Sequence, residues 1–179
     1  KPDINNKKTI LIFHGNAGHI GHRVNKFKPF INSGFGLLLL EYRGYGENLG
    51  IPNENGFYKD GLASINFLVK QKIPLHQIVI YGESLGNGVA TKLSTEFSFH
   101  STILESAFTS INDVAQHHYW YLPAKWLVLD SYDILTIVNK IKSPLLLIHG
   151  EKDNIIKIDF GKKVFDAAPE PKQSIYIPN

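Results

Sequence analysis

The eight residues "YGESLGNG", Tyr81–Gly88, set one serine between two glycines, each two positions away. Apolar residues lead directly into this segment from Ile78, and beyond it apolar residues recur at the spacing of one helix face. Ser84 therefore stands at a predicted strand–turn–helix junction, in the form G-x-S-x-G. This combination is typical of a nucleophile elbow, in which a tight turn lifts a serine hydroxyl clear of a sheet.

Each part of this motif has a physical reason. We expect Gly82 and Gly86 because the turn leaves no room for side chains at these positions. The positive end of the following helix dipole favours negative charge near Ser84, and the backbone N–H of Leu85 points to where an oxyanion forms. The alternative is a glycine-flanked serine that only caps a helix. The strand–turn–helix context favours the nucleophile.

The pattern on either side of this junction predicts an α/β fold. Short apolar runs predict buried strands, and longer amphipathic segments between them predict helices. Such alternation indicates a doubly wound, mostly parallel sheet with helices on both faces. We expect one domain over residues 1–179. The predicted strands are 9–13, 37–42, 78–81, 101–105, 145–149 and 174–177, and the predicted helices end near 32, begin near 55 and at 84, and span about 134–141 and 160–168.

Composition excludes several classes of protein. The net charge of +3 comes without a basic stripe, so nucleic-acid binding is not favoured. With no cysteine the chain can form neither a disulfide nor a cysteine-based zinc site. His19 and His22 lack a carboxylate spaced to complete a metal site, and we expect no metal. No apolar run approaches the roughly 20 residues of a membrane span.

Two further loops follow predicted strands and offer the remaining catalytic groups. In "HGNAG", residues 14–18, the backbone N–H of Asn16 or Ala17 is the predicted second oxyanion donor. The alternative is a glycine-rich strand–helix turn, and the oxyanion role is favoured only together with Ser84. In "HGEKDNII", residues 149–156, Asp153 is the predicted acid. Asp153 could instead cap the next helix, and Glu151 and Glu105 are weaker candidates for the acid.

Together these segments resemble a known family. "HGNAGHIGHR", "YRGYGENLG", "YGESLGNG", "ILESAFTSI" and "HGEKDNII" are similar to the α/β-hydrolase superfamily, in its Bem46/ABHD13/ABHD17-like serine hydrolase branch. The resemblance covers nearly the whole chain. It implies an eight-stranded sheet, a Ser-Asp-His triad, ester or thioester substrates and no cofactor.

The resemblance also implies roles for individual residues. Ser84 matches the nucleophile, Asp153 the acid, and Asn16 and Leu85 the oxyanion donors. Tyr42 and Arg43 match a loop whose role we interpret as structural. Residues 107–133 correspond to a short cap, and its aromatic residues either line a site for an apolar acyl group or belong to the core: Tyr119, Trp120, Tyr121 and Trp126.

The general base is missing from this pattern. The triad order in this fold is Ser, Asp, His, but all eight histidines precede Asp153. The resemblance places the base in a loop after the strand at 174–177. We therefore expect the chain to be truncated at both ends, and this fragment to be inactive because it lacks the triad histidine.

Two other interpretations remain. "GNAGHIG" follows a strand, and Glu41 ends the next one, as in dinucleotide-binding proteins; however, the spacing is G-x-x-G-x-x-G, and Ser84 and Asp153 stay unexplained. The stronger alternative is a catalytically inactive α/β-hydrolase scaffold used for binding. As a hydrolase, the protein is expected to take a small-molecule or lipid-like acyl substrate. A cytoplasmic or a membrane-associated location, the latter through residues outside this chain, fits the sequence equally.

Overall fold

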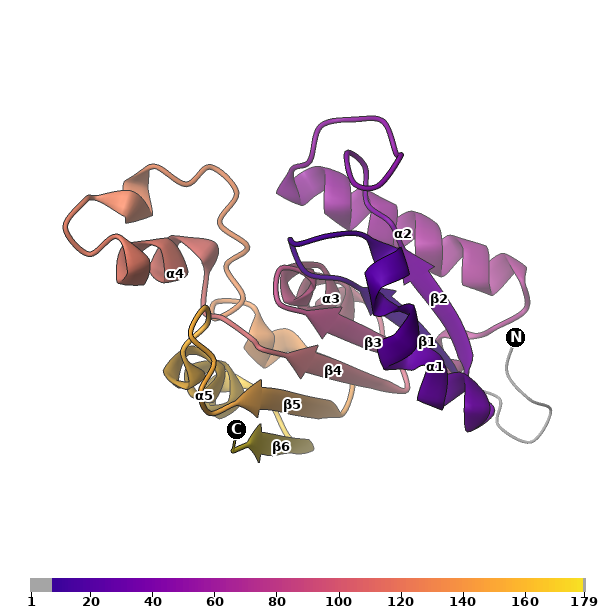
Figure 1. The fold of residues 1–179 in the computed structure, drawn as a ribbon. Coiled ribbons are helices and arrows are strands. Elements are labelled where there is room, and N and C mark those ends of the chain that lie inside the picture. The colour runs from indigo at the N-terminus through magenta and orange to yellow at the C-terminus, as the bar shows by residue number, and fades with distance from the viewer. Residues whose placement is uncertain (1–7, 179) are drawn as a thin grey trace.

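A six-stranded, fully parallel sheet forms the centre of the molecule. The computed structural model describes residues 8–178, and its strands lie in the order β2-β1-β3-β4-β5-β6 (Figure 1). Each neighbouring pair is parallel. The doubly wound, parallel architecture predicted from the sequence is therefore present. The strands are β1 (Thr9–Phe13), β2 (Gly36–Leu40), β3 (Ile78–Glu83), β4 (Ser101–Glu105), β5 (Leu145–Gly150) and β6 (Lys172–Ile177).

Helices cover both faces of this sheet. On one face α1 packs through Phe27 against Ile10, Ile12 and Tyr81. On the other face α2, α3 and α5 bury their apolar sides against the alternate residues of the same strands, such as Leu11. Successive side chains of β1 point to opposite faces of the sheet, so this strand contributes to the core on both faces. The helices are α1 (Val24–Asn32), α2 (Glu54–Lys70), α3 (Gly86–Glu96), α4 (Ile111–His118) and α5 (Ile158–Ala167).

The strand order creates a crevice at one edge of the sheet. From β1 the chain crosses to β2 on one side, and β3 then pairs with β1 on the other side. Ligands on open parallel sheets bind where the order reverses in this way, outside the carboxyl ends of the strands. The loops that follow β1 and β3 meet there, and they are the loops that carry Asn16 and Ser84.

The predicted helix at 134–141 is wrong. The segment contains turns and only one short 3₁₀ helix, Val138–Lys140. Asp133 accepts from the backbone N–H of Thr136 as an N-cap residue does, but only turns and this 3₁₀ helix follow it. Some element boundaries also differ from prediction. The strand expected at 37–42 ends at Leu40, and α3 begins at Gly86, two residues after Ser84.

Within residues 107–133, the segment predicted to be a cap, α4 and the chain after it project beyond the carboxyl edge of the sheet (Figure 1). Residues 107–133 contain α4 and a 3₁₀ turn, Ala124–Trp126. Ser110 caps α4 by accepting from the N–H of Asp113, whose carboxylate pairs with Lys125. Among residues 8–178 there is no helix with the length and apolar character needed to cross a membrane.

Candidate active site

Ser84 lies in a strained turn between β3 and α3. Its φ of +49° falls in the left-handed region that residues with a side chain rarely adopt. The N–H of Ser84 donates to Glu105 O at 3.0 Å, and Ser84 O accepts from the N–H of Asn87 at 2.8 Å. These bonds hold the serine in the strained conformation that the sequence motif predicts for a nucleophile.

The glycines that flank Ser84 are required by close backbone contacts. A Cβ on Gly86 would lie 2.0 Å from Phe13 O, and one on Gly82 would lie 2.8 Å from the Cα of Asn87. Since both obstacles are backbone atoms, no rotamer change could make room. The turn therefore tolerates only glycine at these positions, as its sequence indicated.

The loop after β1 comes up against this turn. A Cβ on Gly15 would lie 3.2 Å from the Cβ of Ser84, so the two loops are in direct contact. Within residues 8–178, the backbone N–H groups of Asn16, Ala17 and Leu85 donate to no acceptor. The predicted oxyanion donors thus flank Ser84 with their hydrogen bonds unused. Their assignment as an oxyanion hole stays a prediction.

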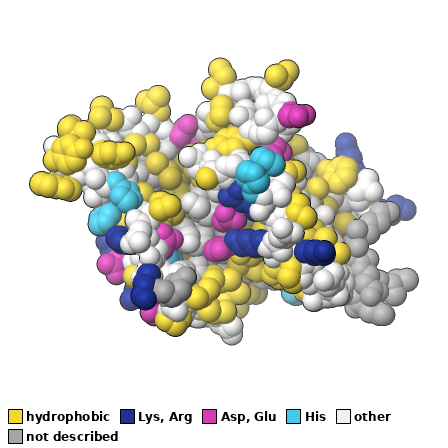
Figure 2. All heavy atoms as spheres, in the orientation of Figure 1, with side chains coloured by type: hydrophobic (Ala, Val, Ile, Leu, Met, Phe, Trp, Pro, Cys, Tyr) yellow, Lys and Arg dark blue, Asp and Glu magenta, His cyan; other side chains and the backbone are white. Residues whose placement is uncertain are grey.

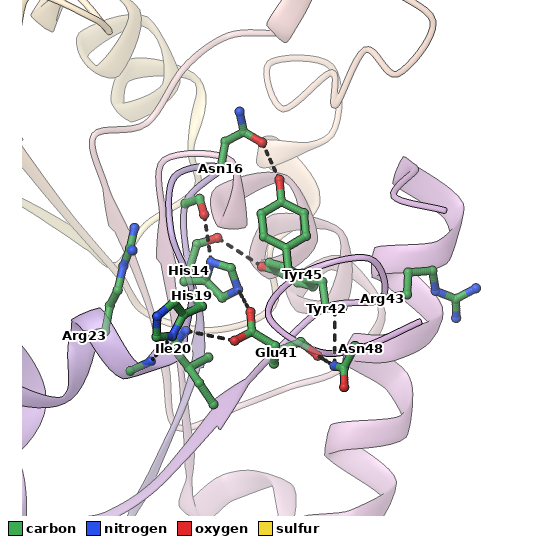
Figure 3. A network of polar contacts seen from close by, with 12 residues as sticks. His14, Asn16, His19, Ile20, Arg23, Glu41, Tyr42, Arg43, Tyr45 and Asn48 are labelled. Atoms are coloured by element: carbon green, nitrogen blue, oxygen red, sulfur yellow. Dashed lines mark hydrogen bonds and ion pairs between the residues drawn. The ribbon is translucent and has the colours of Figure 1, made fainter. Parts of the chain in front are cut away.

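A polar network holds this loop from beneath (Figure 3). His14 is buried, and its Nδ1 donates to Gly15 O at 2.7 Å. Its Nε2 lies 3.0 Å from Glu41 Oε1, outside the direction that a good hydrogen bond needs. Glu41 also accepts from the N–H of Ile20 at 3.0 Å. The loop after β2 therefore supports the loop after β1.

Tyr45 contacts the same loop through the side chain of Asn16. Its hydroxyl donates to Asn16 Oδ1, and its ring stands edge-on to His14 at 5.4 Å (Figure 3). Burial and the charge of Glu41 raise the pKa of Tyr45, so the hydroxyl keeps its proton and remains a donor at neutral pH. Tyr45 belongs to the motif "YRGYGENLG", from which no role for this tyrosine was predicted. A tyrosine inside a glycine-rich loop after a strand was the available signal.

Asp153 lies beside the serine site, in the loop after β5. Its Oδ1 accepts from the N–H groups of Ile155 and Ile156, each at 2.9 Å. Its Oδ2 lies 3.9 Å from Nε2 of His149, a buried residue that donates to Ile156 O at 2.8 Å. His149 is thus packed and hydrogen-bonded. Asp153 lines a cavity of about 390 Å³ together with Ser106.

The other acid candidates have different partners. Glu105 pairs with Lys26 of α1 and accepts from the hydroxyl of Tyr81 at 2.5 Å. Glu151 is exposed, and its N–H donates to Ile177 O at 2.9 Å. Glu105 is therefore engaged by a cation and a hydroxyl and Glu151 is exposed, whereas backbone N–H groups hold Asp153, whose role as the acid stays a prediction.

A cavity of about 590 Å³ opens beside Ser84. Asn16, Tyr45 and Leu85 share it with Ser84, whereas Asp153 lines the neighbouring cavity. The walls of the Ser84 cavity are largely aliphatic or aromatic, and no histidine of residues 8–178 is among its lining residues. The remainder of the wall is Pro52, Asn53, Phe57, Ile111, Val114, Leu127, Val128, Leu129, Asp130, Tyr132, Ile155 and Ile156.

The prediction for the aromatic residues of the cap is wrong. Tyr119, Trp120, Tyr121 and Trp126 neither line this cavity nor belong to the core, because they are 53–86% exposed. Figure 2 shows hydrophobic side chains gathered on this part of the cap, at the upper left. The aliphatic residues that follow them in the chain form the cavity wall instead. The outward aromatic positions lie where α4 and the following turn project beyond the sheet.

Comparison with known proteins decides the family. The family model described as "Serine aminopeptidase, S33" (Hydrolase_4) matches residues 4–129. The chain is an α/β-hydrolase of this family. The superfamily resemblance noted in the sequence is therefore confirmed, including its ABHD-type character.

Relatives of this α/β-hydrolase include proteins with lipase names. The zebrafish protein "Lysophosphatidylserine lipase ABHD12" is 37% identical over 183 residues, which cover 91% of this chain and 48% of that protein. An uncharacterized protein of Mycobacterium tuberculosis is 34% identical over 170 residues, covering 94% of this chain and 60% of its own length. The chain thus spans about half the length of the curated relatives it matches.

Solved structures confirm the fold. Est1E from Butyrivibrio proteoclasticus, bound to ferulic acid, superposes with a TM-score of 0.78 at 17% identity, over 99% of this chain and 82% of that chain. The Pyrococcus furiosus esterase Pf2001 gives a TM-score of 0.78 at 19% identity, over 97% of this chain and 74% of that chain. At such low identities these likenesses establish the α/β-hydrolase fold alone.

Proposed function

We propose that this α/β-hydrolase cleaves carboxylic ester or thioester bonds, with Ser84 as its nucleophile. The observation that carries the proposal is the position of Ser84: it lies in a left-handed turn, in the same cavity as Asn16 and Leu85. The lipase name of the zebrafish relative supports an ester substrate.

The proposed reaction proceeds through an acyl-enzyme. Ser84 Oγ attacks the substrate carbonyl carbon while a general base takes the hydroxyl proton. The carbonyl oxygen becomes an oxyanion, which the N–H groups of Asn16 and Leu85 stabilise. Collapse of this intermediate expels the alcohol or thiol, which receives the proton from the base. Water then attacks the acyl-serine in the same manner and releases the acid.

Asp153 acts as the acid that orients the base. Two backbone N–H groups hold its Oδ1, and in this proposal Oδ2 binds the base. No histidine of residues 8–178 lines the Ser84 cavity, and the matched relatives are about twice as long as the region they share with this chain. We therefore assign the base to a histidine of the longer protein that follows Asp153 in the chain.

The cavity favours an apolar acyl group. Leu127, Leu129 and Ile155 are exposed apolar residues among those that line it, and burying an acyl chain against apolar residues is favourable by about 0.8 kcal/mol per methylene. A lipid-like ester therefore fits better than a short polar one. The name of the zebrafish relative, a lysophosphatidylserine lipase, agrees with a lipid ester but fixes no head group for this protein.

The test uses the full-length protein, a fluorophosphonate probe and p-nitrophenyl butyrate. Ser84→Ala should abolish labelling and lower turnover by roughly 10⁶-fold, as removal of a triad nucleophile does. Asp153→Asn should fold normally and lose roughly 10⁴-fold in turnover, because the base loses its orienting carboxylate. Residues 1–179 alone should hydrolyse the ester far more slowly than the full-length protein.

Three outcomes would contradict parts of the proposal. Retention of most activity in Ser84→Ala would exclude Ser84 as nucleophile. If Glu105→Gln lowers turnover as predicted for Asp153→Asn, and Asp153→Asn does not, the acid follows β4 instead. If the folded full-length protein shows no Ser84-dependent hydrolysis of butyrate, octanoate or thioester substrates, the binding-scaffold alternative is favoured.

A further inference from the structure

One side chain joins the loop of Asn16 to the turn of Ser84. Arg23 donates from Nη1 to Ala17 O at 2.6 Å and from Nη2 to Glu83 Oε1 at 2.9 Å. Ala17 follows Asn16 in its loop, and Glu83 directly precedes Ser84. Only 13% of the Arg23 side chain is exposed, so its guanidinium is largely shielded from water.

The loop also packs directly against this arginine. Gly18 has a φ of +75°, and a Cβ there would lie 2.4 Å from Nδ1 of His22 and 3.1 Å from Nη1 of Arg23. On its other side the loop touches Ser84 through Gly15. The loop is therefore confined between the side chains that precede α1 and the turn after β3.

The partner of Arg23 is a charged carboxylate. Burial by itself would raise the pKa of Glu83, but the hydrogen bond from Arg23 and the contacts of Lys26 outweigh it and lower that pKa. Lys26 binds the second oxygen, Oε2, at 3.1 Å and also pairs with Glu105. Within residues 8–178, no hydrogen bond or ion pair joins Lys26 to the loop of Asn16. Arg23 and Lys26 thus share the carboxylate of Glu83, but of the two only Arg23 also binds the loop that carries Asn16.

We propose that Arg23 is a positioning residue, which fixes the two halves of the oxyanion hole relative to each other. The inference rests on the proposed function. The N–H groups of Asn16 and Leu85 come from different loops, yet both must lie about 2.7–3.1 Å from one oxyanion. A guanidinium donates in two fixed directions within one plane. It can therefore hold Ala17 O and Glu83 at a set separation, which a single ammonium group cannot do.

Kinetics of the full-length protein test this role. With p-nitrophenyl butyrate, Arg23→Gln and Arg23→Lys should each lower kcat by about 10²-fold, the loss expected when catalytic groups shift by about 1 Å. KM should change by less than about threefold, because the lost interaction belongs to the transition state. Thermal unfolding of each variant shows whether it is folded, and the lysine variant keeps the charge.

Inhibitor affinity separates positioning from general damage to the site. A trifluoromethyl ketone forms a hemiketal with Ser84 Oγ, and its oxygen occupies the oxyanion hole as an anion. Its affinity should fall in parallel with kcat/KM in both Arg23 variants. The affinity of butyramide, which binds as an uncharged ground-state analogue, should stay within about threefold of wild type. Equal losses for both inhibitors would overturn the positioning role.

Lys26→Gln is the matched control. It removes a cation from the same carboxylate and should change kcat by less than about threefold, since a partly exposed ion pair is worth little. If Lys26→Gln matches Arg23→Gln, the effect comes from the charge of Glu83 and the inference is wrong. The proposed function is tested separately, by activity of the wild-type protein that is lost in Ser84→Ala. If the wild-type protein has no such activity, the proposed function fails. If the wild-type protein is active but its kcat does not depend on Arg23, only the inference about Arg23 is overturned.

Discussion

At the scale of single residues, the site depends on how Asn16 is held. His14 Nδ1 donates to Gly15 O, and in a trans peptide the carbonyl and the following N–H point in opposite directions. This bond therefore fixes the direction of the N–H of Asn16. Tyr45 binds the Asn16 side chain and Arg23 the carbonyl of Ala17, so the segment that carries the proposed donor is held at three consecutive residues.

Tyr45→Phe tests the contact to the Asn16 side chain. The substitution removes one hydroxyl but keeps the ring, which packs against His14 and Phe57. Since a neutral hydrogen bond contributes about 0.5–1.5 kcal/mol, we expect kcat of the full-length protein to fall about 3- to 10-fold. Steady-state hydrolysis of p-nitrophenyl butyrate measures it.

A double-mutant cycle supplies the control for Tyr45. In the background of Asn16→Ala, Tyr45→Phe should cause no further loss, because its partner is already absent. Tyr58→Phe should leave kcat unchanged, since the hydroxyl of Tyr58 binds Glu96 away from the cavity. An equal effect of Tyr45→Phe in both backgrounds would show that the tyrosine does not act through Asn16.

At the scale of elements, the nucleophile turn is fixed by contact between α3 and β1. The first turn of α3 lies so close to the end of β1 that hydrogen is the only side chain that fits at Gly86. The backbone of the helix therefore sets the height of Ser84 above the sheet. The same contact brings the loop that follows β1 to the serine, so one packing interface builds both parts of the site.

Gly86→Ala should consequently destabilise the protein. Its Cβ would meet Phe13 O at 2.0 Å and Phe13 C at 2.6 Å, so the helix or the strand has to move. Overpacking of this kind costs about 1–3 kcal/mol and occasionally more, and we expect the upper end of that range or a failure to fold. Urea denaturation monitored by circular dichroism measures the free energy of unfolding.

Gly61→Ala is the comparison for Gly86→Ala. It lies inside α2, where a Cβ would meet side-chain atoms alone: methyl groups of Leu93 and Val89 at 2.8 and 3.0 Å, and Cε1 of Phe13 at 3.4 Å. These can shift, and alanine is favoured over glycine within a helix by about 1 kcal/mol. The free energy of unfolding should therefore change by less than about 1 kcal/mol. Equal losses in the two variants would show that the β1 contact has no special importance.

At the scale of the whole molecule, ion pairs join segments that are distant in the chain. Arg23 and Lys26 connect the region around α1 to the ends of β3 and β4. Arg43 joins the loop after β2 to Asp60 of α2 through Nε and Nη2, in agreement with the structural role expected for this arginine. Because these pairs need ionised carboxylates, the stability of the fold should depend on pH.

Asp60 allows this dependence to be tested apart from catalysis. Burial would raise its pKa, but hydrogen bonds from Arg43 outweigh that and lower it. The unfolded chain, with an ordinary pKa of about 3.9, then binds protons more tightly than the folded protein. The stabilisation is thus complete above about pH 4 and is lost as pH falls through the lower folded-state pKa.

The free energy of unfolding should therefore decrease on acidification below about pH 4. In Asp60→Asn this decrease should be smaller, because one of the responsible carboxylates is gone. Urea denaturation at several values between about pH 2.5 and 7 measures the slope. Glu47→Gln is the control, since Glu47 is exposed and forms no ion pair within residues 8–178. An unchanged slope in Asp60→Asn would contradict the assignment.

The sequence by itself determined the features that depend on local pattern. Runs of apolar residues predicted all six strands, because a buried parallel strand must be apolar on both faces. The spacing of Gly82, Ser84 and Gly86 predicted the turn, since its geometry involves only neighbouring residues. The helix expected at 134–141 was wrong because turns and one 3₁₀ helix suffice to bury Ile134, Val138 and Ile141, whose spacing had suggested an α-helix.

Only the tertiary structure decided which loops meet and which side chains hold them. Arg23 and Glu83 are 60 positions apart, and no periodicity relates them. They come together because β3 pairs with β1, and strand order is a property of the packed sheet. The same holds for Tyr45 and for the aliphatic wall of the cavity, whereas the aromatic cap residues proved exposed. A local pattern predicts elements, but contacts between distant loops depend on how those elements pack.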